Sequence, residues 1–166
     1  MLDEVRLNLW NDGAESGKQV TFDEALLEQY KLYVEMADRA SQRRGTANAF
    51  FLSVNSLAAA VVGTLWADPP AASTWFLIFP LVILEGVCVA WFWIVRSYRQ
   101  LNAGKWMVVG ALEERLPASP WWRAEWMALG QGEDQSKYWP LTHLEQWIPC
   151  LFAVTYAVAF VVSLVA

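Results

Sequence analysis

The stretch TANAFFLSVNSLAAAVVGTLWA, residues 46–67, decides the fold because it contains no charged side chain. A helix needs about 20 consecutive, mostly apolar residues to cross the hydrocarbon core of a membrane. Helices are suited to this because their backbone polar groups bond one another within the segment and leave none unpaired in lipid. Residues 46–67 are therefore predicted to form a membrane-spanning helix.

Two later stretches have the same character. Residues 74–95 carry Glu85 as their only charge, and residues 147–166 carry none. The segment 67–73 between the first two stretches is too short to hold a domain. The predicted fold class is an all-α integral membrane protein with three transmembrane helices plus a helical cytoplasmic layer.

The composition of the 166-residue chain agrees with a membrane environment. Apolar residues make up 56% and charged residues 17%, which is a poor surface for a water-soluble monomer. The formal net charge of −5 argues against nucleic acid as a partner. Cys88 and Cys150 lie in apolar segments without the spacing of a metal site, so we expect no bound metal.

Charged residues mark the parts outside the membrane. Residues 1–20 are expected to be a flexible N-terminal arm, and residues 21–45 a cytoplasmic helix leading into the first span. Thr21 and Glu24 fit a capping box at the start of that helix. Residues 96–146 are expected to form a second cytoplasmic helical region.

The region 96–146 is predicted to contain two helices. An amphipathic helix at 101–116 ends before Pro117, and Ser119 followed by Pro120 is typical of the start of a short helix. The tryptophans of the short helix fit either a membrane-surface element or the lid of a cytoplasmic core, and we favour the core: Trp121, Trp122 and Trp126.

Orientation follows from the basic residues, because Lys and Arg near span ends stay on the cytoplasmic side. All of them lie within 6–44 or 96–137. We therefore expect the N-terminus in the cytoplasm, and the 67–73 turn and the C-terminus outside. The first residues lack the features of a signal peptide, so the first span is expected to be the insertion signal.

Glu85 is the most informative polar residue of the spans. An ionised carboxylate in mid-membrane must face water, or else be neutralised and hydrogen-bonded. Counting along the helices predicts one polar layer from all three spans: Glu85, Asn55, Ser56, Thr155 and Tyr156. The layer fits either an ion or proton site in a pore, or interhelical hydrogen bonding in which Glu85 donates to Asn55 or a carbonyl. We favour hydrogen bonding because no second carboxylate, Lys or His lies in any span.

Small and polar residues also form a stripe along the first span: Asn48, Ala59, Ala60 and Gly63. Small residues let helix backbones approach closely in lipid. The stripe is therefore interpreted as a packing face, with a pore lining as the alternative.

Reactive groups are sparse. His143, the only histidine, could act as a cytoplasmic switch, but a structural hydrogen bond or helix start is favoured. The adjacent pairs Glu113 with Glu114 and Glu133 with Asp134 are interpreted as solvated faces. Catalytic motifs are missing from the sequence, so we expect no enzyme and no cofactor other than bound lipid.

Three stretches together resemble the RipA family of small bacterial octameric membrane proteins. They are EQYKLYVEMADRASQRRGTANAFFLSVN at 28–55, GALEERLPASP at 110–120 and YWPLTHLEQWIP at 138–149. The resemblance covers about residues 24–160 and implies a homo-octamer in the bacterial cytoplasmic membrane with no established activity. A weaker similarity links the chain to two-span effector modules of bacterial nucleotide-signalling defence systems, from which the third span departs.

The expected function is a self-assembling, homo-oligomeric membrane scaffold, because two spans and the 21–45 helix offer more packing surface than a three-helix monomer can bury. Two alternatives stay open at this point: a pore with Glu85 at mid-membrane, and a membrane effector of a signalling or defence system. The sequence identifies no soluble partner.

Overall fold

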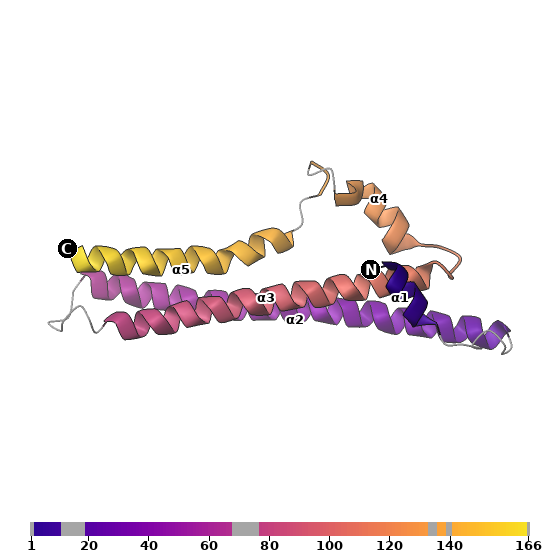
Figure 1. The fold of residues 1–166 in the computed structure, drawn as a ribbon, viewed down its shortest axis with the longest axis horizontal. Helices are drawn as coiled ribbons and strands as arrows, with labels where there is room; N and C mark the ends of the chain where they lie inside the picture. The colour runs from indigo at the N-terminus through magenta and orange to yellow at the C-terminus, as the bar shows by residue number, and fades with distance from the viewer. Residues whose placement is uncertain (1, 11–18, 68–76, 133–135, 139–140, 166) are drawn as a thin grey trace. The chain divides into compact units, whose positions relative to one another are not determined.

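The computed structural model describes residues 2–10, 19–67, 77–132, 136–138 and 141–165. Every regular element in these ranges is a helix, which confirms the predicted all-α class (Figure 1). In chain order the elements are α1 (Leu2–Leu9), α2 (Gln19–Ala67), α3 (Ile78–Glu113), η3 (Pro120–Glu125), α4 (Trp126–Ala128), η4 (Gly130–Gly132) and α5 (Leu141–Val165).

The chain divides into two compact units. Unit 1 consists of Met1–Gln42 and Tyr98–Pro140, and unit 2 consists of Arg43–Ser97 and Leu141–Ala166. The division falls close to the positions where the sequence changes from charged to apolar. Unit 2 thus holds the three expected spans, and unit 1 holds the charged segments.

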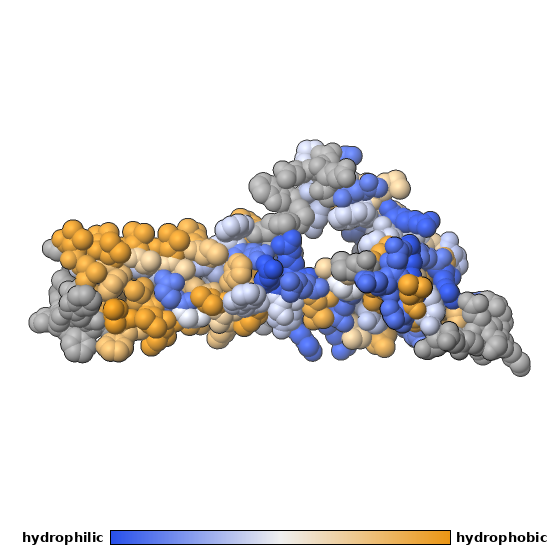
Figure 2. All heavy atoms as spheres, in the orientation of Figure 1, coloured by the Kyte–Doolittle hydropathy of each residue, from blue (hydrophilic) through white to orange (hydrophobic). Residues whose placement is uncertain are grey.

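Unit 2 is built from the apolar parts of α2, α3 and α5, which run side by side in alternating directions (Figure 1). All three helices are long and apolar enough to cross a membrane, as predicted. Large apolar side chains point outward from this unit, and Figure 2 shows hydrophobic residues over its visible face. Such a surface is stable in lipid rather than in water; its members include Phe50, Leu57, Phe79, Val82, Ile83, Leu151, Val154 and Val158.

Unit 1 has a small core between α2 and α3. One face of α2 is buried through Leu26, Ala37 and Ala40, residues whose spacing places them on the same side of the helix. From α3, Val109 and Leu112 are buried. The small alanines let the two helices approach closely.

The helix starts differ in part from the expectation. α1 is a short helix, Leu2–Leu9, within the expected N-terminal arm. α2 begins at Gln19, so the expected helix start at Thr21 was wrong. Pro80 lies in the first turn of α3, where a helix needs no amide donor.

Candidate functional site

The centre of unit 2 contains a polar cluster of Asn55 from α2, Cys88 from α3 and Tyr156 from α5. All three side chains are buried. The Tyr156 hydroxyl lies 2.8 Å from the backbone oxygen of Asn55 and 3.2 Å from its Oδ1, so it donates to either. The Cys88 thiol donates to Asn55 Oδ1 at 3.4 Å, and Asn55 Nδ2 donates to the Phe51 carbonyl at 2.9 Å.

This arrangement satisfies the polar atoms of an amide in a solvent that offers no hydrogen bonds. The Asn55 oxygen has acceptor sites for both Tyr156 and Cys88, while its nitrogen bonds within α2. Each of the three spanning helices therefore contributes one member. Buried side-chain bonds of this kind hold transmembrane helices in register.

A second layer of the same unit is aromatic. The indole nitrogen of Trp91 donates to Asn48 Oδ1 at 2.8 Å. The Trp91 ring stacks on Phe51 at 5.8 Å between centroids and contacts Phe152 at 6.0 Å. Trp91 is 1% exposed, so its ring is part of the interior of unit 2. Trp93, two residues after Trp91, is exposed, and the Arg96 guanidinium lies over its ring.

Glu85 lies three residues before Cys88 on α3, close to the cluster but not bonded within it. Among the residues that the structure describes, no hydrogen-bond partner reaches the buried Oε1 atom of Glu85. The expected bond from Glu85 to Asn55 is replaced by the thiol of Cys88. Nothing in the sequence pointed to Cys88 as a partner beyond its position one turn from Glu85.

The start of α5 is joined to α2 by an ion pair. Arg44 Nε lies 3.4 Å from Glu145 Oε2, and both atoms are buried. Glu145 precedes the apolar part of α5, and Arg44 precedes that of α2. The pair therefore fixes these two spans at their charged ends. The side chain of His143, the expected switch, lies outside what the structure describes.

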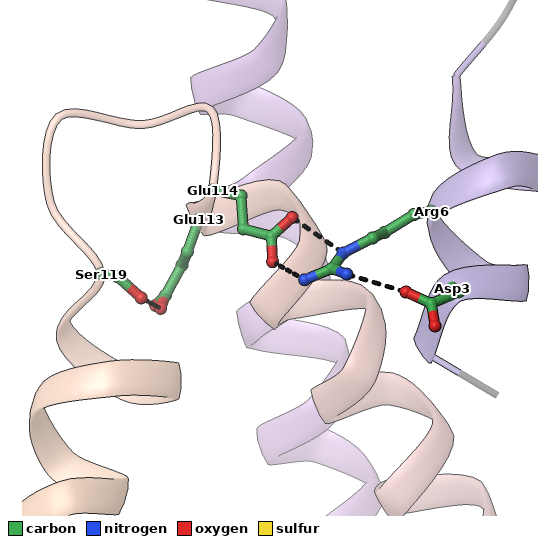
Figure 3. A network of polar contacts seen from close by, with 5 residues as sticks. All are labelled: Asp3, Arg6, Glu113, Glu114 and Ser119. Carbon is green, nitrogen blue, oxygen red and sulfur yellow. Dashed lines mark hydrogen bonds and ion pairs between the residues drawn. The ribbon is translucent and has the colours of Figure 1, made fainter.

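Unit 1 holds a second polar cluster, centred on the buried carboxylate of Glu113 at the end of α3. Oε1 accepts from the Tyr30 hydroxyl at 3.0 Å and the Trp121 amide at 3.2 Å. Oε2 accepts from the Ser119 hydroxyl at 2.7 Å (Figure 3) and the Trp122 amide at 2.9 Å. The expected solvated position of Glu113 was wrong.

The Glu113 carboxylate acts as the cap of the π-helical turn η3. Ser119 precedes η3 as expected, but its hydroxyl bonds Glu113 and caps no amide. A carboxylate at a helix N-terminus binds exposed amides with added electrostatic attraction. Burial and the neighbouring Glu113 raise the pKa of Tyr30, which precedes the expected span, to about 12, so Tyr30 stays a donor at neutral pH.

Glu114, the neighbour of Glu113, anchors α1. Arg6 Nε donates to Glu114 Oε2 at 3.1 Å, and a second Arg6 nitrogen bonds the other oxygen (Figure 3). Arg6 also bonds Asp3 on its own helix at 2.9 Å. The hydrogen bond to Glu114 is the main cause that raises the pKa of the Arg6 guanidinium. The pair is two-pronged but exposed, so its contribution to stability is modest.

In the described ranges, no group of three His, Cys, Asp or Glu side chains could hold a metal ion. The hydrogen bonds of Asn55 and Glu113 instead tie helices together. The Asn55 cluster can hold the three apolar helices in register, and the Glu113 cluster can position the aromatic segment after α3.

A family model of the octameric membrane protein family (8xMP) matches residues 27–165, which is most of the chain. The chain belongs to this octameric membrane protein family. The match confirms the expected kind of family, and the matched residues include both polar clusters but not α1. Neither a curated protein nor a solved structure matches the chain.

In this member of the octameric family, most of the remaining residues of the expected polar layer and stripe are exposed and take no part in the cluster. Ser56 and Thr155 are exposed, and the Thr155 hydroxyl donates to the Leu151 carbonyl of its own helix at 2.8 Å. Ala60 and Gly63 are exposed too, and Ala59 is half-buried. A Cβ atom added at Gly63 would meet no described atom within 4 Å.

Proposed function

We propose that this chain is the subunit of a homo-octamer in a bacterial cytoplasmic membrane, of the RipA type, and that it acts as a non-catalytic scaffold. The match of residues 27–165 to an octameric family carries the proposal. The N-terminus and unit 1 lie in the cytoplasm and the C-terminus lies outside. This orientation rests on the confinement of all Lys and Arg to 6–44 and 96–137.

Self-assembly is supported by the contrast between buried polar side chains, which are bonded within one copy, and small residues exposed on the surface of that copy. Polar atoms of Asn55, Cys88 and Tyr156 are bonded within one copy. Gly63 and Ala60 are small, exposed residues, so a neighbouring helix can approach closely there. The outward stripe thus serves contacts between copies, with membrane lipid filling the surface that copies leave uncovered.

Native mass spectrometry of the detergent-solubilised protein tests the proposal. The expected result is one dominant species at eight times the chain mass, with lipid adducts that are lost at higher collision energy. A monomer or dimer that persists across several mild detergents would overturn the octamer. Phospholipid nanodiscs give a matched measurement in a bilayer, where the same stoichiometry is expected.

A second candidate function is ion or proton conduction, and the unpartnered Oε1 of Glu85 favours it. A carboxylate without a full set of hydrogen bonds in mid-membrane can take up and release a proton or meet a cation. Conduction would appear as a current in planar bilayers that falls severalfold in Glu85→Gln. Thr155→Val is the control, because that hydroxyl bonds its own helix. A silent wild-type protein would exclude conduction.

A further inference from the structure

Unit 1 contains a groove of about 500 Å³ beside α2. Its walls are partly aromatic, with Trp106 from α3 and Trp121 from η3 facing Tyr30 and Val34 of α2. Two carboxylates, Glu35 and Asp38, stand on the α2 side of the groove. The groove therefore combines apolar walls with an acidic edge.

The opposite flank of α2 carries an apolar ridge made of Leu32 and Met36. These side chains are 57% and 41% exposed. Residues two apart on a helix point about 200° from each other, so Leu32 lies opposite Val34 and Met36 opposite Asp38. The same helix thus presents a groove on one flank and a ridge on the other.

The charges of the two flanks are complementary. Arg39, seven residues after Leu32, lies on the ridge flank and is largely exposed. Lys31 also lines the groove but is paired with Glu28 at 2.8 Å. The Asp38 carboxylate, which accepts from Gln42 at 2.9 Å, therefore adds negative charge to the groove. Arg39 bonds Glu35 of its own chain, but an exposed pair of this kind exchanges partners at little cost.

We propose that the Leu32–Met36 ridge of one copy docks in the Val34–Trp106–Trp121 groove of the next copy. The inference rests on the proposed homo-octamer. A closed ring of identical chains requires two different, mutually complementary patches on each copy. The ridge and groove meet that requirement because they differ in shape and charge and lie on opposite flanks of one helix. Arg39 of one copy then meets Asp38 of its neighbour.

Disulfide cross-linking of the full chain in membranes tests the docking. The background is Cys88→Ala with Cys150→Ala, and the test variant adds Leu32→Cys and Val34→Cys. These two thiols cannot bridge within one chain because their Cβ vectors point apart. Mild oxidation is expected to give a ladder of covalent species up to the octamer, which a reducing agent collapses to the monomer.

The matched control pairs Leu27→Cys with Val34→Cys, two thiols on the same flank of α2. It is expected to stay monomeric on the denaturing gel, as is each single-cysteine variant. The test pair is expected to give a ladder only if the docking is right. If it gives none in protein that native mass spectrometry shows to be octameric, the docking is overturned and the octamer still stands. An equally strong ladder from the control pair would also overturn the docking. Absence of an octamer in the unmodified protein would overturn both the docking and the proposed homo-octamer.

Discussion

A single amide, that of Asn55, connects the three spanning helices. Replacement by Ala removes the acceptor shared by Tyr156 and Cys88 and leaves the Tyr156 hydroxyl only the backbone oxygen. Side-chain bonds between membrane helices contribute about 0.6 to 2 kcal/mol each. We therefore expect Asn55→Ala to lower the unfolding free energy by about 1 to 2 kcal/mol, measured by denaturation in mixed micelles. Thr155→Val should change it much less, and equal losses would show that the cluster contributes nothing specific.

A glycine also decides local packing, because a Cβ atom at Gly110 would lie 2.6 Å from Trp122 Cδ2. Gly110→Ala must displace the indole and with it η3, at about 1 to 3 kcal/mol for overpacking. The expected readout is a red-shifted tryptophan emission and a lower melting temperature. Gly104→Ala, on the same helix with open space around its Cβ, should keep the wild-type spectrum. Identical spectra for both variants would contradict the close contact.

At the scale of elements, the short helix after α3 is placed by the Glu113 carboxylate rather than by its own sequence. Glu113→Gln turns one acceptor into a donor that faces the Ser119 hydroxyl and the Trp122 amide. An unsatisfied buried polar group costs about 1 to 3 kcal/mol. We expect faster proteolysis at 117–132 and a lower melting temperature. Glu114→Gln should have a small effect, because its ion pair with Arg6 is exposed.

The aromatic residues of this element only partly confirm the sequence expectation of a core lid. Trp121 packs on Trp106 at 5.7 Å between ring centroids, and Trp122 packs on Gly110. Trp126 and Met127 are exposed within one copy. The sequence pattern could not separate these cases because η3 is a π-helical turn, whose wider spacing rotates each following side chain.

At the scale of the whole molecule, three candidate spans and the confinement of all Lys and Arg to 6–44 and 96–137 lead us to expect the two chain ends on opposite sides of the membrane. Alkaline phosphatase fused after residue 166 should be active, and green fluorescent protein at the same position should be dark. The reverse pattern holds for fusions at the N-terminus. A fluorescent C-terminal fusion would contradict the orientation and the cytoplasmic place of unit 1.

The sequence by itself determined the three helices long and apolar enough to span a membrane, the all-α class, and the level along the helices at which Asn55 and Tyr156 meet. Such features depend on the local sequence, since the free energies of transfer into lipid add up over about 20 neighbouring residues. Only the tertiary structure decided that Cys88 rather than Glu85 bonds Asn55, that Trp91 is buried, and that Glu113 caps η3. These contacts depend on the rotation of long helices about their axes and join residues far apart in the chain, which a linear pattern does not fix.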